Sequence, residues 1–233
     1  MKCVILAAGE GQRMRPLTFE TPKPLLKVAG KTLLERIISN LPPEIDELIL
    51  VIGYKGEQIV NFFGDEFNGF KVKYVWQNEK LGTGHALKLC RHLLGDERFM
   101  MLYADDIHGE LGLKNLLKHE LALASALVED PGRFGVISVG DGGKILEIEE
   151  KPEKPKSNVI SAGAMVLDER IFKYEPARHS NGEFYLTDMV SQMLEEHEVF
   201  AVEASFWLPV GYPEDLKKAE EILNGGHKES DYV

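Results

Sequence analysis

The beginning of the chain carries the residue types that a phosphate-binding site needs. An apolar run over residues 3–8 leads into Gly9 and Gly11, which are followed by Arg13 and then by Lys23 between two prolines. Glycines let the backbone turn tightly and bring unshielded N–H groups up to phosphate oxygens. Arg13 and Lys23 add positive charge, which suits a leaving pyrophosphate. This order of residues predicts a triphosphate site on a flexible polar loop.

Two familiar phosphate-binding patterns do not fit the same residues. Counted from Gly9, the dinucleotide pattern G-x-G-x-x-G would need a glycine at Met14, and Pro16 stands where that pattern would already open a helix. The pattern G-x-x-x-x-G-K-[ST] does not occur in this segment either. The glycines therefore argue against a dinucleotide site and against a P-loop.

Residues 77–86 place an amide ahead of a glycine-rich helix start. The Gln77 side chain can accept and donate hydrogen bonds at once, so together with the Gly82 backbone it can read the imide edge of uracil or thymine. The alternative is that Gly82, Thr83 and Gly84 form only the first turn of a helix. We interpret His85, a lone histidine in that turn, as structural.

Two neighbouring carboxylates follow the apolar run at residues 99–103. Phosphoryl chemistry needs a hard oxygen ligand for Mg²⁺, and the end of a strand holds such a ligand rigidly. Asp105 is the candidate metal ligand. For Asp106 the default interpretation is the cap of a following turn.

Strand-like runs alternate with helix-like segments in the first half of the chain. The strands are expected at residues 3–7, 48–52, 72–76 and 99–103. The helices are expected at residues 32–41, 56–63 and 82–94. This alternation predicts an α/β fold whose largely parallel sheet is covered by helices on both faces. Because ligands of such sheets bind beyond the carboxyl ends of the strands, the loops after Ala7, Trp76 and Tyr103 should converge on one crevice.

The second half of the chain is richer in strands, which are expected at residues 121–128, 134–139, 145–149 and 159–167. A mixed sheet and a smaller lobe are indicated. Residues 187–196 and 213–223 have apolar side chains at helical spacing, with Thr187 and Asp188 at the start of the first helix and Pro213 in the first turn of the second. Residues 225–233 are polar and should form a frayed tail.

Composition narrows the function classes. The chain has 233 residues, 44% of them hydrophobic, and a formal net charge of −11. This charge argues against partnership with nucleic acid or an anionic membrane surface. No apolar stretch approaches membrane-spanning length, so we expect a cytoplasmic protein. Cys3 and Cys90 lie among apolar residues and are expected to be buried, reduced and inert.

The opening motif is specific enough to indicate a family. The pattern L-A-A-G-x-G-x-R-M-x-P-L-T-x-x-x-P-K-P-L resembles the signature of sugar-1-phosphate nucleotidylyltransferases, and residues 77–86 are similar to the base-reading loop of the uridylyl- and thymidylyl-transferring members. The resemblance extends to about Leu223. It implies a Rossmann-like sheet with a β-rich sugar-binding lobe, in one domain over residues 1–224 that divides near residue 120 into nucleotide-binding and sugar-binding halves.

The same resemblance implies roles for individual residues. The catalytic residues would be Arg13, Lys23 and Lys151, and Asp105 would hold Mg²⁺. The residues that bind the nucleotide would be Leu6, Ala7, Ala8, Gly9, Gly11, Gln77, Gly82 and Thr83. The residues that bind the sugar phosphate would be Tyr103, Gly135, Glu150, Ser161, Gly163 and Glu183. For Thr187 and Asp188, which belong to a segment similar to the family sequence, a simple helix cap is the alternative.

One departure from the family pattern concerns the metal. Members place a carboxylate or an amide shortly after the tryptophan that Trp207 matches, whereas this chain has Pro209 and Gly211 there. Either Asp105, phosphate oxygens and water hold the ion, or Asp106 helps, or metal affinity is reduced. We expect transfer of a nucleotidyl group from UTP or dTTP to a sugar-1-phosphate, and the alternative is a regulatory or scaffold subunit with weakened turnover. The sequence leaves the oligomeric state open, a homo-oligomer included.

Overall fold

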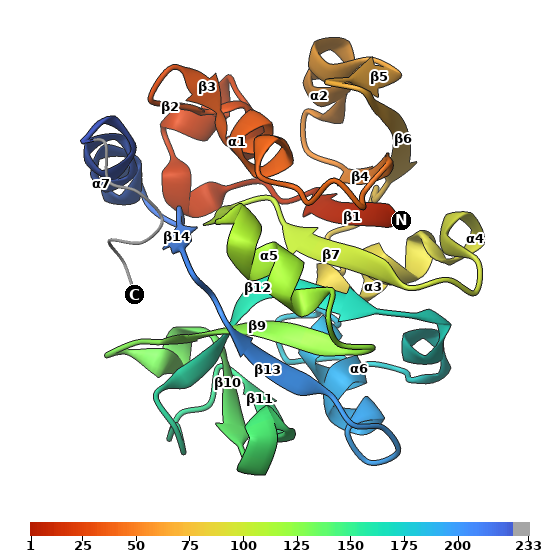
Figure 1. The fold of residues 1–233 in the computed structure, drawn as a ribbon. Coiled ribbons are helices and arrows are strands. Elements are labelled where there is room, and N and C mark those ends of the chain that lie inside the picture. The colour runs from red at the N-terminus through yellow and green to blue at the C-terminus, as the bar shows by residue number, and fades with distance from the viewer. Residues whose placement is uncertain (226–233) are drawn as a thin grey trace.

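A ten-stranded sheet forms the centre of the computed structural model, which describes residues 1–225 (Figure 1). Eight of its strands follow one another in the order β11-β10-β12-β7-β1-β4-β6-β5, while β9 pairs with β12 and β13 pairs with β9. The predicted α/β fold with a Rossmann-like sheet is confirmed. Of the predicted tail, residues 226–233 lie outside the described residues.

The parallel part of the sheet consists of β1 (Lys2–Ala7), β4 (Glu47–Ile52), β6 (Phe70–Trp76) and β7 (Phe99–Tyr103). Ala7 pairs with Ile52 and Ile52 with Trp76, while Leu6 pairs with Tyr103, so these strands end at the same edge. The central strands β1, β4 and β7 are mostly apolar on both sides of the pleat, as a sheet with two covered faces requires, whereas β6 carries exposed Lys71 and Lys73 on one side.

Helices cover both faces of this sheet, as predicted. Cys3 and Ile5 of β1 belong to a core with α1 (Leu33–Ser39), α2 (Gly56–Phe63) and α5 (Glu110–Leu116). Val4 belongs to the opposite core, with α3 (Gly82–Leu89), α4 (Arg91–Leu94) and α6 (Leu186–Met193). Helix α7 (Pro213–Asn224) packs beside β2 at the edge of the molecule (Figure 1).

The strands of the second half join the same sheet instead of forming a separate one. They are β9 (Ala122–Leu127), β10 (Gly135–Val139), β11 (Ile145–Glu150), β12 (Val159–Leu167) and β13 (Phe200–Glu203). Along one edge, β12 is antiparallel to β10 at Ile160 and to β7 from Ala164 to Leu167. Along its other edge it is antiparallel to β9, so it connects the two halves. The expected mixed sheet is confirmed.

Short elements complete the fold. Strand β5 (Glu66–Phe67) lies at the sheet edge, and two small ribbons form from β2 (Lys27–Val28) with β3 (Lys31–Thr32) and from β8 (Asp106–His108) with β14 (Trp207–Pro209). The sequence patterns did not reveal these short strands, or β13 and α5. Within the described chain, no helix is long and apolar enough to cross a membrane.

Two helix boundaries differ from the predictions. The expected helix over residues 82–94 breaks at Cys90, whose N–H bonds to the Leu87 carbonyl three residues back instead of four. Helix α6 begins at Leu186, so Thr187 and Asp188 lie in its first turn, and the alternative that they cap it is wrong because Tyr185 is the N-cap residue. Cys3 and Cys90 are both buried and unpaired, as expected.

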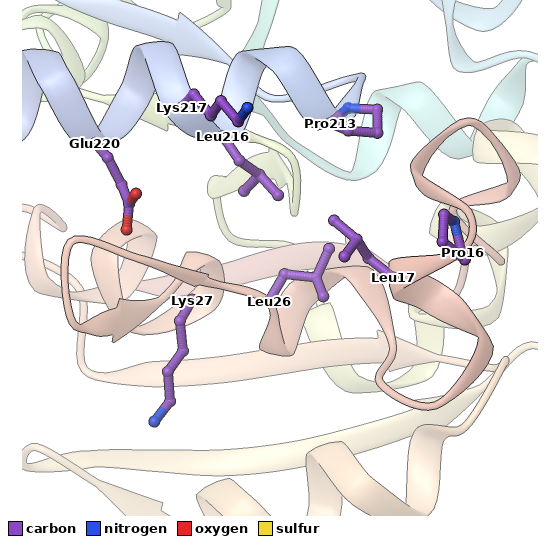
Figure 2. Close-up of a pocket in the computed structure, with 8 residues that line it drawn as sticks. All are labelled: Pro16, Leu17, Leu26, Lys27, Pro213, Leu216, Lys217 and Glu220. Carbon is purple, nitrogen blue, oxygen red and sulfur yellow. The ribbon is translucent and has the colours of Figure 1, made fainter.

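A hollow of about 500 Å³ separates α7 from the loop that follows Arg13 (Figure 2). Leu216 of α7 and Leu17 and Leu26 of the loop point into it. Glu220 at its edge accepts a hydrogen bond from the Ala29 N–H. None of the predicted site residues lines this hollow.

Candidate active site

A larger cavity, of about 800 Å³, lies beyond the carboxyl ends of the parallel strands. The loops after Ala7, Trp76 and Tyr103 do converge on it. It is lined by the predicted residues Leu6, Ala7, Ala8, Gly9, Gly11, Arg13, Lys23, Gln77, Gly82, Thr83, Tyr103, Asp105, Gly135, Glu150, Lys151, Ser161 and Glu183. The fold therefore brings together residues that stand up to 177 positions apart, from Leu6 to Glu183.

The loop after β1 leaves open space at one glycine and a tight contact at the other. A Cβ on Gly9 would have no heavy atom within 4 Å, so this side of the backbone faces the cavity. Gly11 has φ +59°, and a Cβ there would lie 3.0 Å from both Lys23 Cβ and Thr18 Cγ2. The Thr18 hydroxyl also donates to the Gly11 carbonyl at 2.8 Å. Glycine at position 11 thus lets the loop fold down onto Lys23.

Lys23 and Asp105 form an ion pair on the cavity wall. Lys23 Nζ lies 2.6 Å from Asp105 Oδ2, and the two side chains are 10% and 37% exposed. The prediction that Lys23 stands on a flexible polar loop is wrong, because its side chain is buried and its charge has a partner. Asp105 keeps enough exposure to offer its carboxylate to the cavity.

The Gln77 amide is oriented by protein partners on its nitrogen side. Nε2 donates to the Gly82 carbonyl at 3.0 Å and lies 3.0 Å from His85 Nδ1. Because a carbonyl only accepts, the nitrogen must face Gly82, and the amide oxygen has no hydrogen-bond partner within residues 1–225. His85 is thus structural, as interpreted, but its position beside Gln77 was not foreseen.

Residues 184–186 contact and hold residues 77–86, the loop that is predicted to read the base. Gly82 has φ +85°, and a Cβ on it would lie 2.6 Å from the Phe184 carbonyl oxygen. The Leu186 N–H donates to the Thr83 hydroxyl at 3.0 Å, and burial raises the pKa of the neighbouring Tyr103 phenol above its usual range. The predicted base-reading loop is therefore anchored to the segment that leads into α6.

Glu150 and Lys151 form the opposite wall of the cavity. The Thr187 hydroxyl donates to Glu150 Oε2 at 2.9 Å, and Lys151 Nζ lies 3.1 Å from Glu150 Oε1. Burial disfavours the charged form of Lys151, yet Glu150 outweighs this effect and raises the pKa of the ammonium. The Lys151 ammonium also lies 4.8 Å from the centre of the Tyr185 ring. Lys151 is thus held as a cation beside the cavity.

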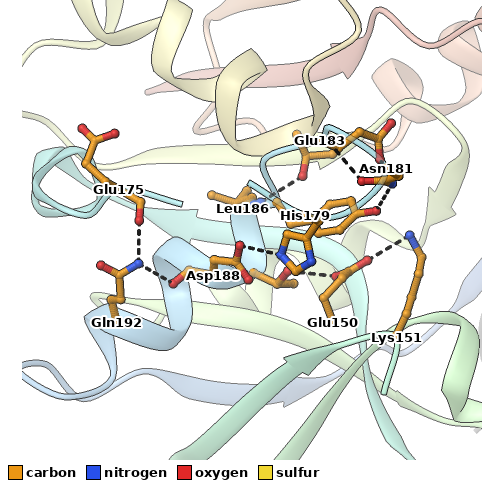
Figure 3. Close-up of polar contacts among 12 residues, drawn as sticks. Glu150, Lys151, Glu175, His179, Asn181, Glu183, Leu186, Asp188 and Gln192 are labelled. Atoms are coloured by element: carbon orange, nitrogen blue, oxygen red, sulfur yellow. Dashed lines mark hydrogen bonds and ion pairs between the residues drawn. The ribbon is translucent and has the colours of Figure 1, made fainter. Parts of the chain in front are cut away.

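A network of polar side chains supports this wall from behind (Figure 3). Asn181 donates to Glu183 Oε2 at 3.0 Å and to the Tyr185 hydroxyl at 2.6 Å. His179 Nε2 lies 2.8 Å from Asp188 Oδ2, and its ring packs against that of Tyr185. Asp188, in the first turn of α6, therefore contributes its side chain to this network.

On the Asp105 side of the cavity, Asp106 also lines the wall, although it is largely buried in β8 and accepts a hydrogen bond from Trp207 Nε1 at 3.1 Å. The interpretation of Asp106 as a turn cap is wrong. Burial and the adjacent Asp105 raise its pKa well above the usual range. Gly163 has φ +82° and packs against Asp106 and Tyr103 rather than lining the cavity, whereas Ser161 lines it with a buried hydroxyl that has no partner among residues 1–225.

Arg13 and Arg133 meet at a tyrosine that sequence reasoning missed. Their ζ carbons lie 5.0 and 4.9 Å from the centre of the Tyr212 ring, and all three residues line the cavity. A hydrogen bond from Arg13 lowers the pKa of the Tyr212 phenol. No local pattern indicates such a contact, because the three residues stand in three distant segments.

The family model for nucleotidyl transferases matches residues 2–225. The chain belongs to the nucleotidyl transferase family. Among its curated relatives is the bifunctional protein GlmU of Methanocaldococcus jannaschii, 38% identical over 226 residues that cover 96% of this chain and 54% of the relative. Another family member, the UTP–glucose-1-phosphate uridylyltransferase AglF of Haloferax volcanii, is 34% identical over 237 residues that cover 96% of both chains. The chain thus spans about half the length of its GlmU relatives.

Solved structures share the fold of the present chain over nearly all of its length. A Bacillus anthracis protein assigned as a glucose-1-phosphate thymidylyltransferase, solved with sucrose, superposes with a TM-score of 0.83 at 27% identity and covers 99% of both chains. A UDP-glucose pyrophosphorylase solved with UDP-glucose gives a TM-score of 0.85 over 97% of this chain and 99% of the other, at 23% identity. The second match supports the fold alone.

Proposed function

We propose that the protein transfers a nucleotidyl group from UTP or dTTP to a sugar-1-phosphate. In this reaction an oxygen of the sugar phosphate attacks the α-phosphorus, the bond from that phosphorus to the bridging oxygen breaks, and its electron pair leaves with pyrophosphate. No protein nucleophile is needed, because positioning and charge neutralisation suffice. The observation that carries the proposal is a single cavity with Arg13 and Lys23 on one wall and Glu150 and Lys151 on the other.

The nucleotide half of the cavity would hold the triphosphate and the base. The open backbone at Gly9 admits phosphate oxygens, and Arg13 neutralises charge on the leaving group. The unpartnered Gln77 oxygen can accept the imide N–H that uracil and thymine carry, whereas cytosine presents an acceptor at that position. The relation of the chain to a uridylyltransferase and a thymidylyltransferase supports the same pair of bases.

The sugar half would hold the attacking phosphate. Lys151, kept charged beside Glu150, is placed to bind the phosphate, and Glu150 and Glu183 can accept hydrogen bonds from sugar hydroxyls. The partnerless Ser161 hydroxyl offers one further contact. We propose that residues 1–120 and 121–224 divide the work in this way within one domain.

The residues present fit Mg²⁺ carried by the substrate rather than a preformed metal cage. Within residues 1–225, no group of three or more His, Cys, Asp and Glu side chains is arranged to hold a metal. Asp105 offers one carboxylate to the cavity, and Pro209 and Gly211 line it without a side-chain ligand. Mg²⁺ commonly binds through one or two carboxylates, with substrate phosphates and water completing its coordination. Asp105 would hold the ion, which would neutralise phosphate charge.

The test is turnover with a panel of substrates. The purified chain is incubated with UTP, dTTP, CTP, GTP or ATP and a set of sugar-1-phosphates in Mg²⁺ or Mn²⁺, and both pyrophosphate and the nucleotide-sugar are measured. We expect product with UTP or dTTP. Binding of these triphosphates without product would favour the alternative, a regulatory or scaffold subunit.

A further inference from the structure

Tyr212 gathers two guanidinium groups from opposite halves of the chain. Arg13 lies in the turn after β1, and Arg133 ends the short helix Pro131–Arg133 that precedes β10. Both ζ carbons are about 5 Å from the same ring centre, so they are at most about 10 Å apart. Cations over an aromatic face are attracted by its quadrupole, which holds both side chains at the cavity wall.

These two guanidiniums differ from the other cations around the cavity. Lys23 pairs with Asp105, Lys80 with Glu10 and Lys151 with Glu150. Within residues 1–225, neither Arg13 nor Arg133 has a carboxylate oxygen within 4 Å. Two like charges held close together repel each other, so an anion bound between them would relieve an unfavourable interaction.

Asp215, an acidic residue three positions after Tyr212, has its carboxylate bound to the backbone. Asp215 Oδ2 accepts hydrogen bonds from the Gly211 and Tyr212 N–H groups, both at 2.8 Å. It fixes the turn that carries the tyrosine ring and leaves the arginines unneutralised. In a chain with a net charge of −11, this concentration of unpaired positive charge marks a place for an anion.

We propose that Arg13 and Arg133 form one anion site, positioned by Tyr212, that takes the pyrophosphate part of the triphosphate. This inference rests on the proposed function. As the bond from the α-phosphorus to the bridging oxygen breaks, the leaving pyrophosphate gains negative charge, and two planar guanidiniums can donate paired hydrogen bonds to its oxygens. Arg133 is then a catalytic residue contributed by the sugar half, and Tyr212 is a positioning residue.

Direct binding of inorganic pyrophosphate tests the site without turnover. Calorimetric titrations compare the parent chain with Arg13→Gln and Arg133→Gln. The control is Arg91→Gln, which removes the same charge from an arginine that packs on the Phe172 ring outside the cavity. We expect each cavity variant to weaken the affinity for pyrophosphate at least tenfold and the control to leave it unchanged. Parent-like affinity in Arg133→Gln would overturn the proposal.

The positioning role of Tyr212 is tested by comparing a variant that loses the aromatic ring with one that keeps it. Tyr212→Leu should weaken pyrophosphate binding, whereas Tyr212→Phe, which keeps the ring face, should restore most of it. Equal losses in both variants would overturn the positioning role of the ring.

In the reverse reaction, Arg133→Gln should raise KM for pyrophosphate more than KM for the nucleotide-sugar. A larger rise in KM for the nucleotide-sugar would contradict the assignment of Arg133 to the pyrophosphate site. A chain that binds pyrophosphate through both arginines but forms no nucleotide-sugar would refute the proposed function and leave this anion site standing.

Discussion

Lys23 Nζ lies 2.6 Å from Asp105 Oδ2, so the candidate phosphate ligand and the candidate metal ligand neutralise each other on the wall of the cavity. A triphosphate carrying Mg²⁺ would separate their tasks, because its oxygens would attract the ammonium and its metal would attract the carboxylate. The ion pair would thus make metal binding and nucleotide binding interdependent.

We therefore expect Mg²⁺ or Mn²⁺ to bind weakly to the free protein and far more tightly with UTP or dTTP present. Asp105→Asn should remove this coupling and lower turnover by about 10²-fold or more, the scale of losing a preorganised charge. Metal titrations with and without nucleotide measure the coupling. Tight metal binding to the nucleotide-free parent, or full turnover in Asp105→Asn, would place the ligands elsewhere.

Base selection should depend on the nitrogen side of Gln77. In Gln77→Glu the donors to the Gly82 carbonyl and His85 are lost, and a carboxylate oxygen then faces that carbonyl. A mismatch of this kind costs about 1–3 kcal/mol, so kcat/KM with UTP or dTTP should fall about tenfold or more. The control is Gln192→Glu, since Gln192 also donates to backbone carbonyls but lies outside the cavity. Similar triphosphate preferences in the parent and Gln77→Glu would contradict base reading by this residue.

Removal of either of two threonine hydroxyls should raise the KM of only one of the two substrates. Thr187→Val removes the donor to Glu150 and should raise KM for the sugar phosphate about fivefold, the equivalent of about 1 kcal/mol. Thr18→Val removes the donor to the Gly11 carbonyl and should instead raise KM for the triphosphate. Steady-state kinetics with each substrate varied in turn give both values. If both variants change the same KM, the assignment of one cavity wall to the triphosphate and the other to the sugar phosphate is wrong.

Gly163 should be intolerant of a side chain. Its Cβ would lie 2.1 Å from Asp106 Oδ2, and its φ is +82°. Gly64 is a matched control, with φ +60° and no heavy atom within 4 Å of an added Cβ. We expect Gly64→Ala to lower the free energy of unfolding by about 1 kcal/mol and Gly163→Ala by at least about 3 kcal/mol, because only the latter adds a clash to backbone strain. Equal losses in urea unfolding would show that the contact with Asp106 is relieved by small movements.

The thiols of Cys3 and Cys90 should not react in the folded protein at pH 8. Burial raises the pKa of both, to about 12 for Cys90, so the reactive thiolate is scarce. In the unfolded chain the pKa of a cysteine thiol is about 8.5. The contribution of the two buried neutral thiols to the free energy of unfolding is therefore complete below that pH and declines as pH rises above it. A thiol reagent should modify two groups in denaturant and none without it, and rapid modification of the native chain would contradict their burial.

The sequence was most informative where local patterns and final contacts coincide. The parallel strands were found because each is a short apolar run followed by polar loop residues, and their ends converge because parallel strands share an edge. The glycines, the basic residues and the carboxylate of the cavity were found through motif spacing. Elements of two or three residues, such as β8 and β14, carry too little periodicity to be recognised.

Contacts between distant segments could not be predicted. Arg133 and Tyr212 stand 79 positions apart and meet through an aromatic face that leaves no local pattern. The burial of Lys23 follows from the fold of the Gly11 turn over it, and Asp106 became a partner of Trp207 only because β8 pairs with β14. Each of these facts depends on tertiary packing, which decides whether a charged side chain is exposed or paired.

Strand β12 limits how far the two halves of the protein can move apart. Because β12 pairs with β10 and β7 along one edge and with β9 along the other, the two walls of the cavity belong to one continuous sheet. Rotating one half away from the other would break backbone hydrogen bonds in the middle of the molecule. In the proposed reaction, substrates would therefore enter and pyrophosphate would leave through rearrangement of the loops around the sheet. The rate of product release should respond to changes in those loops and be insensitive to changes in the sheet.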